Sequence, residues 1–193
     1  DENYSPIKYK QFKSDVEALG TALMSLNLKD KMIAIIGENR YEWVLSFFAA
    51  VCGVGVAVPI DRMLPENEIL NLLRRSKSSA VIFSDYIKLD YKPEHVIGMD
   101  YQADEEGVLS FPELIKKGAS LLEQGDRSFL DLTVDSEVMN ILLFTSATTD
   151  QSKAVMLSHR NITQNLMAMS SMTYIGEDDV FLSVLPIHHT YEC

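Results

Sequence analysis

The sequence predicts an α/β fold in which a mainly parallel sheet is flanked by helices. Short apolar runs alternate along the chain with segments of helical periodicity, as in sheets whose parallel strands are joined by helical crossovers. The 193 residues are 47% hydrophobic and 23% charged, an ordinary globular composition that excludes a disordered chain. At roughly 150 residues per domain, this length allows little more than one domain.

The first two predicted elements are an amphipathic helix and a buried strand. From Phe12 to Leu26, apolar residues recur at alternating steps of four and three, which places them on one stripe of a helix. Residues 31–36 then form a short apolar run that ends at Gly37, which is typical of a buried strand followed by a turn.

A second helix and a second strand follow. Residues 41–52 are apolar on nearly every side, which predicts a helix that is covered all round. Residues 54–58 predict a strand that closes at Pro59. The uncharged stretch 43–60 approaches transmembrane length, but Gly53, Gly55 and Pro59 divide it, so we expect a core segment and no transmembrane span.

The third predicted helix has clear signals at both ends. Pro65, Glu66 and Glu68 favour its first turn, and Arg74 and Arg75 favour its last turn, because these charges complement the helix dipole. Residues 80–83 and residues 96–99 predict the third and fourth strands.

The second half of the chain predicts two more helices and three more strands. The acidic stretch 100–107 is expected to be a solvated loop, and after it Ser110 and Glu113 form a capping-box pair ahead of a helix that Gly125 ends. Ser158 is expected to cap the last helix. The ranges are 138–144, 154–157 and 180–185 for the strands and 158–174 for the last helix.

Charge and cysteine content narrow the function class. The formal net charge of −11 repels polyanions, so we expect no nucleic-acid partner. Cys52 and Cys193 lie at distant positions with no metal-binding spacing, which favours a reducing, cytoplasmic location. The chain begins at Asp1 without a signal-peptide pattern, and we expect it to be a piece of a longer protein.

Residues 144–159 contain the most chemical information, because a hydroxyl-rich loop with one lysine follows a buried strand. Ligands of open α/β sheets bind at such positions. Hydroxyls and backbone amides can donate hydrogen bonds to a chain of phosphates, and Lys153 adds a mobile positive charge. Lys153 lies between Ser152 and Ala154, so the loop is not a Walker A motif. A simple polar turn between two strands is the alternative. The hydroxyl residues are Thr145, Ser146, Thr148 and Thr149.

This segment resembles the phosphate-binding signature of the AMP-forming acyl- and aryl-CoA synthetase superfamily, Tyr/Phe-Thr-Ser-Gly-Thr-Thr-Gly-x-Pro-Lys-Gly-Val-x-Leu-Ser-His-x-Asn. Residues 37–61 and 185–189 resemble the same family, in the manner of long-chain fatty acid CoA ligases. The resemblance implies that residues 1–193 are a partial N-terminal, AMP-binding domain, the first and incomplete part of an acyl-CoA synthetase-like fold, with the C-terminal domain absent. The matching residues are Thr145, Ser146, Thr148, Thr149, Lys153, Val155, Leu157, Ser158, His159 and Asn161.

The resemblance implies a ligase that uses ATP to convert a carboxylic acid, expected to be a fatty acid, into an acyl-adenylate and then into a thioester with CoA or a carrier-protein thiol. Lys153 would contact the β- or γ-phosphate, and His189 would lie beside the carboxylate and the α-phosphate; these are the implied catalytic residues. Mg²⁺ would be held mainly by residues outside this chain, and we expect no metal site within it. The implied nucleotide-binding residues are Thr145, Ser146, Ala147, Thr148, Thr149, Asp150 and Lys153.

Four residues depart from the signature: Ala147, Asp150, Ser152 and Ala154 stand where it has Gly, Gly, Pro and Gly. An alanine in a left-handed conformation costs on the order of 1 kcal/mol. The carboxylate of Asp150 would repel a polyphosphate unless Mg²⁺ or Lys153 intervened. Either the loop has a different shape here, or nucleotide affinity is impaired.

Three hypotheses follow. The first is the N-terminal part of an AMP-forming long-chain fatty acid CoA ligase, catalytically silent by itself and prone to self-association through an unfinished sheet. The second is a non-catalytic nucleotide-binding or interaction module that descends from the family. The third is a free-standing flavodoxin-like domain that binds a phosphate ligand and folds as a soluble monomer.

Overall fold

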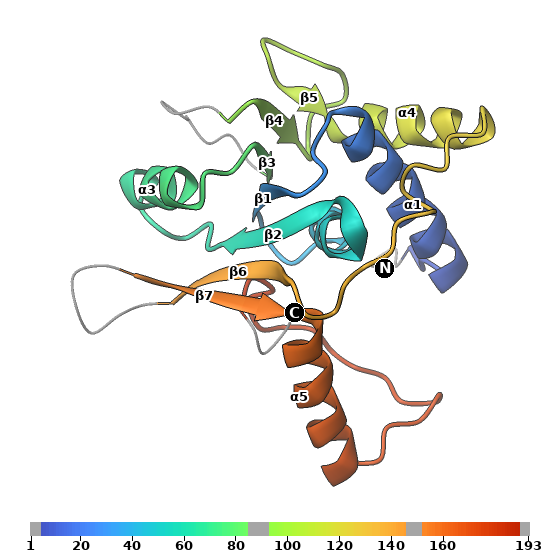
Figure 1. Ribbon diagram of the computed structural model, residues 1–193, viewed down its shortest axis with the longest axis vertical. Coiled ribbons are helices and arrows are strands. Elements are labelled where there is room, and N and C mark those ends of the chain that lie inside the picture. Colours follow the sequence, from blue (N-terminus) through green and yellow to red (C-terminus); the bar gives the residue numbers. More distant parts are fainter. Residues whose placement is uncertain (1–4, 85–92, 146–151, 190–193) are drawn as a thin grey trace.

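The computed structural model describes residues 5–84, 93–145 and 152–189, and within them a seven-stranded sheet is flanked by helices (Figure 1). The strand order is β5-β4-β3-β1-β2-β6-β7, and all neighbours pair in parallel except β7, which runs antiparallel to β6. The predicted α/β class is confirmed. The strands are β1 (Lys31–Ile36), β2 (Gly55–Ile60), β3 (Ala80–Phe83), β4 (His95–Gly98), β5 (Leu109–Ser110), β6 (Met139–Thr145) and β7 (Lys153–Ser158), and the helices are α1 (Tyr9–Ser25), α2 (Tyr41–Ala49), α3 (Glu66–Ser76), α4 (Phe111–Glu123) and α5 (His159–Met172).

The sheet separates two hydrophobic cores. Because successive side chains of a strand point to opposite faces, Ile33 and Ile35 of β1 enter one core and Ala34 and Ile36 enter the other. Helices α1, α2 and α4 cover the first core, and α3 covers the second. Burial on both faces explains why β1 is apolar without alternation.

The predicted helix over residues 41–52 is divided in the structure. The α-helix ends at Ala49, and a π-helical turn, η1 (Ala50–Val54), leads into β2. Gly53 has φ +128°, a conformation that side-chain-bearing residues rarely adopt. Gly53 therefore permits the chain to leave the π-helical turn and enter β2.

Both predicted helix caps form, one of them with an unexpected partner. Ser158 and Asn161 make a reciprocal capping box at the start of α5. At α4 the Ser110 hydroxyl accepts from the Glu113 amide (3.3 Å), but the Ser110 amide donates to the carboxylate of Asp104 (2.7 Å). The acidic loop thus supplies the second half of this cap, and the Glu113 carboxylate pairs with Lys116.

The strand predicted at residues 180–185 is wrong. This stretch forms no strand and pairs with none among the described residues, and Val180 and Leu182 are 95% and 85% exposed. A β-strand needs a neighbour for its backbone N–H and C=O groups, which a local apolar pattern cannot guarantee. At Leu185 the chain contacts the loop that follows β1, where the Asn39 side chain donates to the Leu185 carbonyl oxygen.

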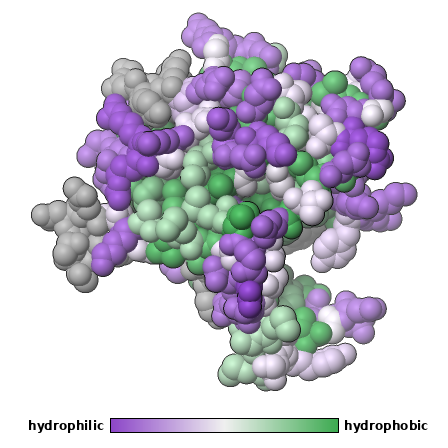
Figure 2. Space-filling model, viewed as in Figure 1, coloured by the Kyte–Doolittle hydropathy of each residue, from purple (hydrophilic) through white to green (hydrophobic). Residues whose placement is uncertain are grey.

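Apolar surface gathers at one end of the sheet. Figure 2 shows hydrophobic residues over the β6–β7 end and on the lobe that α5 and the following chain form below it. No residue of α5 is buried, and Met156, Met167 and Met172 are each more than two-thirds exposed. None of the described helices is both long and apolar enough to cross a membrane.

Candidate functional site

The carboxyl ends of β2 and β6 define a topological switch point of the sheet. These two strands are parallel neighbours aligned at Ala57 and Ile141, so both run toward the same edge. After β2 the chain returns to β3 on one side, whereas after β6 it continues to β7 on the other. Ligands of open α/β sheets bind in the crevice that opens where neighbouring connections diverge in this way.

The two ends of the hydroxyl-rich loop lie at this switch point. Thr145 is the last residue of β6 and Lys153 is the first of β7, and the two are opposite each other in the antiparallel register. Both are exposed, so the Lys153 ammonium and the Thr145 hydroxyl are accessible to a ligand. The other predicted nucleotide-binding residues, Ser146, Ala147, Thr148, Thr149 and Asp150, lie outside the described residues.

Helix α3 holds the β7 end of this loop. The Arg75 guanidinium donates to the Ser152 carbonyl oxygen at 2.7 Å and stacks over the Phe144 ring, 5.3 Å from its centroid. The Ser152 hydroxyl donates to the Glu68 carboxylate at 3.2 Å. Ser152 stands where the family signature has proline, so hydrogen bonds to α3 take the place of a rigid ring.

Sequence reasoning assigned Glu68 and Arg75 to the helix dipole alone. Their spacing of seven residues places them on one helix face two turns apart, which was the available signal. The partner of that face is Ser152, which lies 77 positions beyond Arg75 in the chain.

We expect Arg75→Ala to weaken ATP binding by the complete protein about 3- to 10-fold, because Ser152 and the adjacent Lys153 lose a fixed position. Thermal stability should change little, since exposed pairs contribute about 1 kcal/mol or less. Titration with a non-hydrolysable ATP analogue measures this, and Arg127→Ala is the control, as it removes an exposed arginine from the 126–137 connection. Equal affinity in the Arg75→Ala variant would contradict the assigned role.

The predicted histidine lies in a turn that docks beside β1. His189 donates its backbone amide to the Pro186 carbonyl oxygen at 3.0 Å, which closes the turn, and its side chain is exposed. The Asn39 side chain bonds the same segment at Leu185 and Ile187. His188 Nε2 lies 3.7 Å from Asp61 Oδ2 in the loop after β2. Residues after β1 and β2 thus fix this turn at the carboxyl edge of the sheet.

A cavity of about 530 Å³ lies between this turn and the sheet, lined by Gly37, Glu38, Asn39, Asp61, Arg62, Met63, Ser183, Val184, Pro186 and His188. Burial lowers the pKa of His188 and the neighbouring His189 adds to this, while Asp61 opposes it. Burial would raise the pKa of Glu38, but a hydrogen bond from Ser84, a backbone hydrogen bond and the charges of Arg40 and Arg62 together lower it. The lining of the cavity therefore includes a carboxylate whose pKa is lowered and an imidazole whose pKa is lowered.

His159 has a structural role. Its Nε2 lies 2.8 Å from the Val51 carbonyl oxygen of the π-helical turn η1, at the start of α5. This agrees with the expectation that His159 belongs to the beginning of the last helix.

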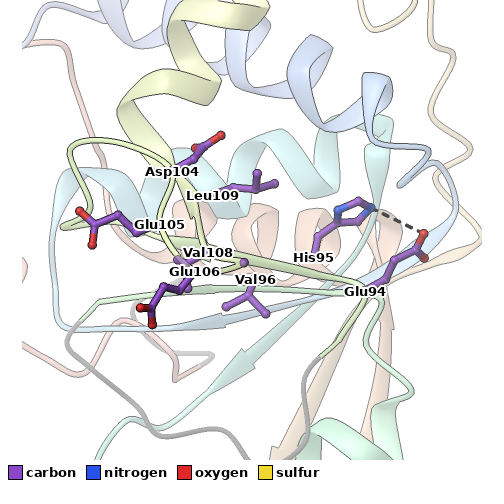
Figure 3. Close-up of a pocket in the computed structure, with 9 residues that line it drawn as sticks. Glu94, His95, Val96, Asp104, Glu105, Glu106, Val108 and Leu109 are labelled. Carbon is purple, nitrogen blue, oxygen red and sulfur yellow. Dashed lines mark ion pairs between the residues drawn. The ribbon is translucent and has the colours of Figure 1, made fainter.

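A second cavity, of about 280 Å³, lies beside β4 and β5, at the end of the strand order away from β7. Its lining is acidic but is not organised as a metal site. Figure 3 shows that its carboxylates, Glu94, Asp104, Glu105 and Glu106, point in different directions. Among the residues that the structure describes, no three His, Cys, Asp or Glu side chains converge to hold a metal ion.

Comparisons with known proteins identify relatives of this chain. A family model described as AMP-binding enzyme matches residues 2–193. Long-chain-fatty-acid–CoA ligase 5 of Rattus norvegicus is 30% identical over 98% of this chain, and a chloroplastic long-chain-fatty-acid–[acyl-carrier-protein] ligase of Arabidopsis thaliana is 28% identical over 97%. The chain spans 31% and 29% of these two proteins, about a third of their length.

Solved structures show the same fold. A long-chain-fatty-acid-CoA ligase from Archaeoglobus fulgidus superposes with a TM-score of 0.81 at 17% identity, over 100% of this chain and 39% of its own. A red-emitting luciferase from Phrixothrix hirtus also gives 0.81 at 22% identity, over 99% of this chain and 38% of its own. This chain thus shares its fold with these two proteins.

Proposed function

Because this chain belongs to the AMP-binding enzyme family, we propose that it is part of an ATP-dependent, AMP-forming long-chain fatty acid ligase. The proposal rests above all on Thr145 and Lys153, which lie opposite each other at the switch point where an α/β sheet binds its ligand. The curated relatives named above support fatty acids as the substrate class.

In the first half-reaction, a carboxylate oxygen of the fatty acid attacks the α-phosphorus of ATP, and the bond to the bridging oxygen of pyrophosphate breaks. The electron pair leaves with pyrophosphate. The carboxylate is already ionised, so no general base is required, and catalysis consists of positioning and charge stabilisation.

Lys153 and Thr145 act on the leaving group. The Lys153 ammonium pairs with the β- or γ-phosphate and stabilises the charge that develops on pyrophosphate. The Thr145 hydroxyl donates a hydrogen bond to the same chain of phosphates. His189 lies beside the fatty carboxylate and the α-phosphate, where an imidazole N–H can hold the attacking oxygen in line.

In the second half-reaction, a thiol sulfur attacks the acyl carbon of the adenylate, the bond to the AMP oxygen breaks, and the thiol proton passes to solvent. The thiol is that of CoA or of a carrier protein, both of which occur in the names of curated relatives. Since the chain spans about a third of those relatives, we propose that catalysis requires the full-length protein.

Pyrophosphate release from the full-length protein, with palmitate, ATP and Mg²⁺, tests the proposed function. We expect release that depends on the fatty acid, and formation of palmitoyl thioester when CoA or a carrier protein is added. Absence of turnover across a panel of short, medium and long acids would instead favour a non-catalytic nucleotide-binding module. Ala147 and Asp150 stand where the family signature has glycine, and this observation favours the second function.

A further inference from the structure

Asn39 joins two parts of the chain that are 146 residues apart. Its Nδ2 donates to the Leu185 carbonyl oxygen at 2.6 Å, and its Oδ1 accepts from the Ile187 amide at 2.9 Å. Asn39 belongs to the loop between β1 and α2, at the carboxyl edge of the sheet. One planar side chain therefore satisfies a backbone acceptor and a backbone donor of the histidine turn, residues 185–189.

These two bonds need a carboxamide. The Leu185 carbonyl can only accept and the Ile187 amide can only donate, so the tethering side chain must present a donor and an acceptor side by side. An ionised carboxylate offers acceptors alone, and an alanine offers neither.

The two hydrogen bonds of Asn39, called the tether from here on, lie where the chain passes from exposed to buried residues. Val184 is 68% exposed and Leu185 43% exposed, whereas Ile187 is 8% exposed and packs in the core that contains Trp43. Beyond Ile187, the His189 amide closes the turn on Pro186. Asn39 bonds the chain at Leu185 and Ile187, four and two residues before His189. These bonds thus set the position of the His189 backbone.

We propose that Asn39 is a positioning residue, which sets the histidine turn so that His189 can meet the fatty carboxylate. This inference rests on the proposed function of His189. In this proposal Asn39 acts through residues 185–189 and not through a contact of its own with the substrate or the nucleotide.

The test uses the full-length protein and fatty-acid-dependent ATP–pyrophosphate exchange. We expect Asn39→Ala to lower kcat/KM for the fatty acid about 10- to 100-fold, as misplacement of a reacting group by about 1 Å can do. The dissociation constant for a non-hydrolysable ATP analogue should stay within about 2-fold of the wild-type value, because Asn39 bonds the histidine turn and not the hydroxyl-rich loop between β6 and β7. The control Gln102→Ala, which removes an exposed carboxamide from the acidic loop, should leave both unchanged.

Coupling to the histidine distinguishes positioning from general support of the fold. If Asn39 acts through His189, the double variant Asn39→Ala/His189→Ala should be no slower than His189→Ala alone. Two losses that multiply in the double variant, or a nucleotide affinity that falls together with kcat/KM, would overturn the inference.

The isosteric variant Asn39→Asp provides a second test, the pH dependence of its exchange activity. This test remains available should Asn39→Ala fold poorly. When ionised, the new carboxylate faces the Leu185 carbonyl oxygen and repels it, which raises its pKa above the ordinary value. When protonated, it can donate to that oxygen as the amide does. Relative to wild type, its exchange activity should therefore recover about 3-fold or more between pH 8 and pH 5.5, whereas Asn39→Ala should show no such recovery. A flat ratio for Asn39→Asp would contradict the tether.

Failure of the proposed function would be recognised separately. If the wild-type protein shows no exchange with any acid, the enzyme assignment fails, and hydrogen exchange at the Ile187 amide still tests the tether. Faster exchange of that amide in Asn39→Ala than in Gln102→Ala supports the tether, and equal exchange overturns it.

Discussion

Replacement of Lys153 by alanine in the full-length protein is expected to slow adenylate formation about 100- to 1,000-fold, the usual effect of removing one donor aimed at developing charge. Lys153 is the first residue of β7 and lies opposite Thr145, so it stands at the end of the hydroxyl-rich loop. The effect should appear in fatty-acid-dependent ATP–pyrophosphate exchange.

The second half-reaction provides the internal comparison. When preformed acyl-adenylate is supplied, transfer to the thiol should stay within about 3-fold of wild type, because the triphosphate is already gone. Lys116→Ala, which removes an exposed lysine from α4, is the matched control and should leave both half-reactions unchanged. Equal losses in both half-reactions for Lys153→Ala would contradict the assignment of this lysine to the leaving group.

Gly118→Leu is expected to destabilise the domain by about 3 kcal/mol or more. Gly118 of α4 packs against the backbone of α1, and a Cβ at this position would lie 1.8 Å from the Ala18 carbonyl oxygen. Neither helix backbone can move aside as a flexible side chain could, so the two helices must separate. Separation would open the core above Leu19 and Phe111, both of which are almost fully buried.

Thermal unfolding of the full-length protein measures this effect. About 3 kcal/mol corresponds to a fall in Tm of roughly 6 to 12 °C in a domain of about 150 to 250 residues, and to a smaller fall where a larger domain unfolds as one unit. Ala119→Leu adds the same side chain at the next position, which is exposed, and should leave Tm nearly unchanged. A Gly118→Leu variant with wild-type Tm would show that α1 and α4 do not pack as closely as described.

The elements that sequence reasoning located best are those with two buried faces and clear ends. β1 and β3 begin and end where the apolar runs do, since Gly37 and the serines around residues 78 and 84 bound them. Helix α3 was equally well bounded, because its charges complement the dipole at both ends.

Predictions failed where the outcome depends on distant partners. The run at 180–185 has the composition of a strand, but no strand edge among the described residues lies beside it. The two-residue strand β5 was not predicted, because it exists through its pairing with β4 and has no pattern of its own.

The candidate site was predicted in part. The hydroxyl and lysine pattern predicted a loop after a buried strand, and the structure has Thr145 as the last residue of β6 and Lys153 as the first residue of β7. Arg75 at Ser152 and Asn39 at the histidine turn act across 77 and 146 residues, and no local periodicity encodes such contacts. These supporting residues became visible once the fold had brought the loops together.

The most direct test of the central claim is a crystal structure of the full-length protein with a non-hydrolysable ATP analogue. We predict that the β- and γ-phosphates lie within hydrogen-bond distance of Lys153 Nζ and the Thr145 hydroxyl, at the carboxyl ends of β6 and β2. A triphosphate bound elsewhere, with Lys153 and Thr145 turned to solvent, would contradict it.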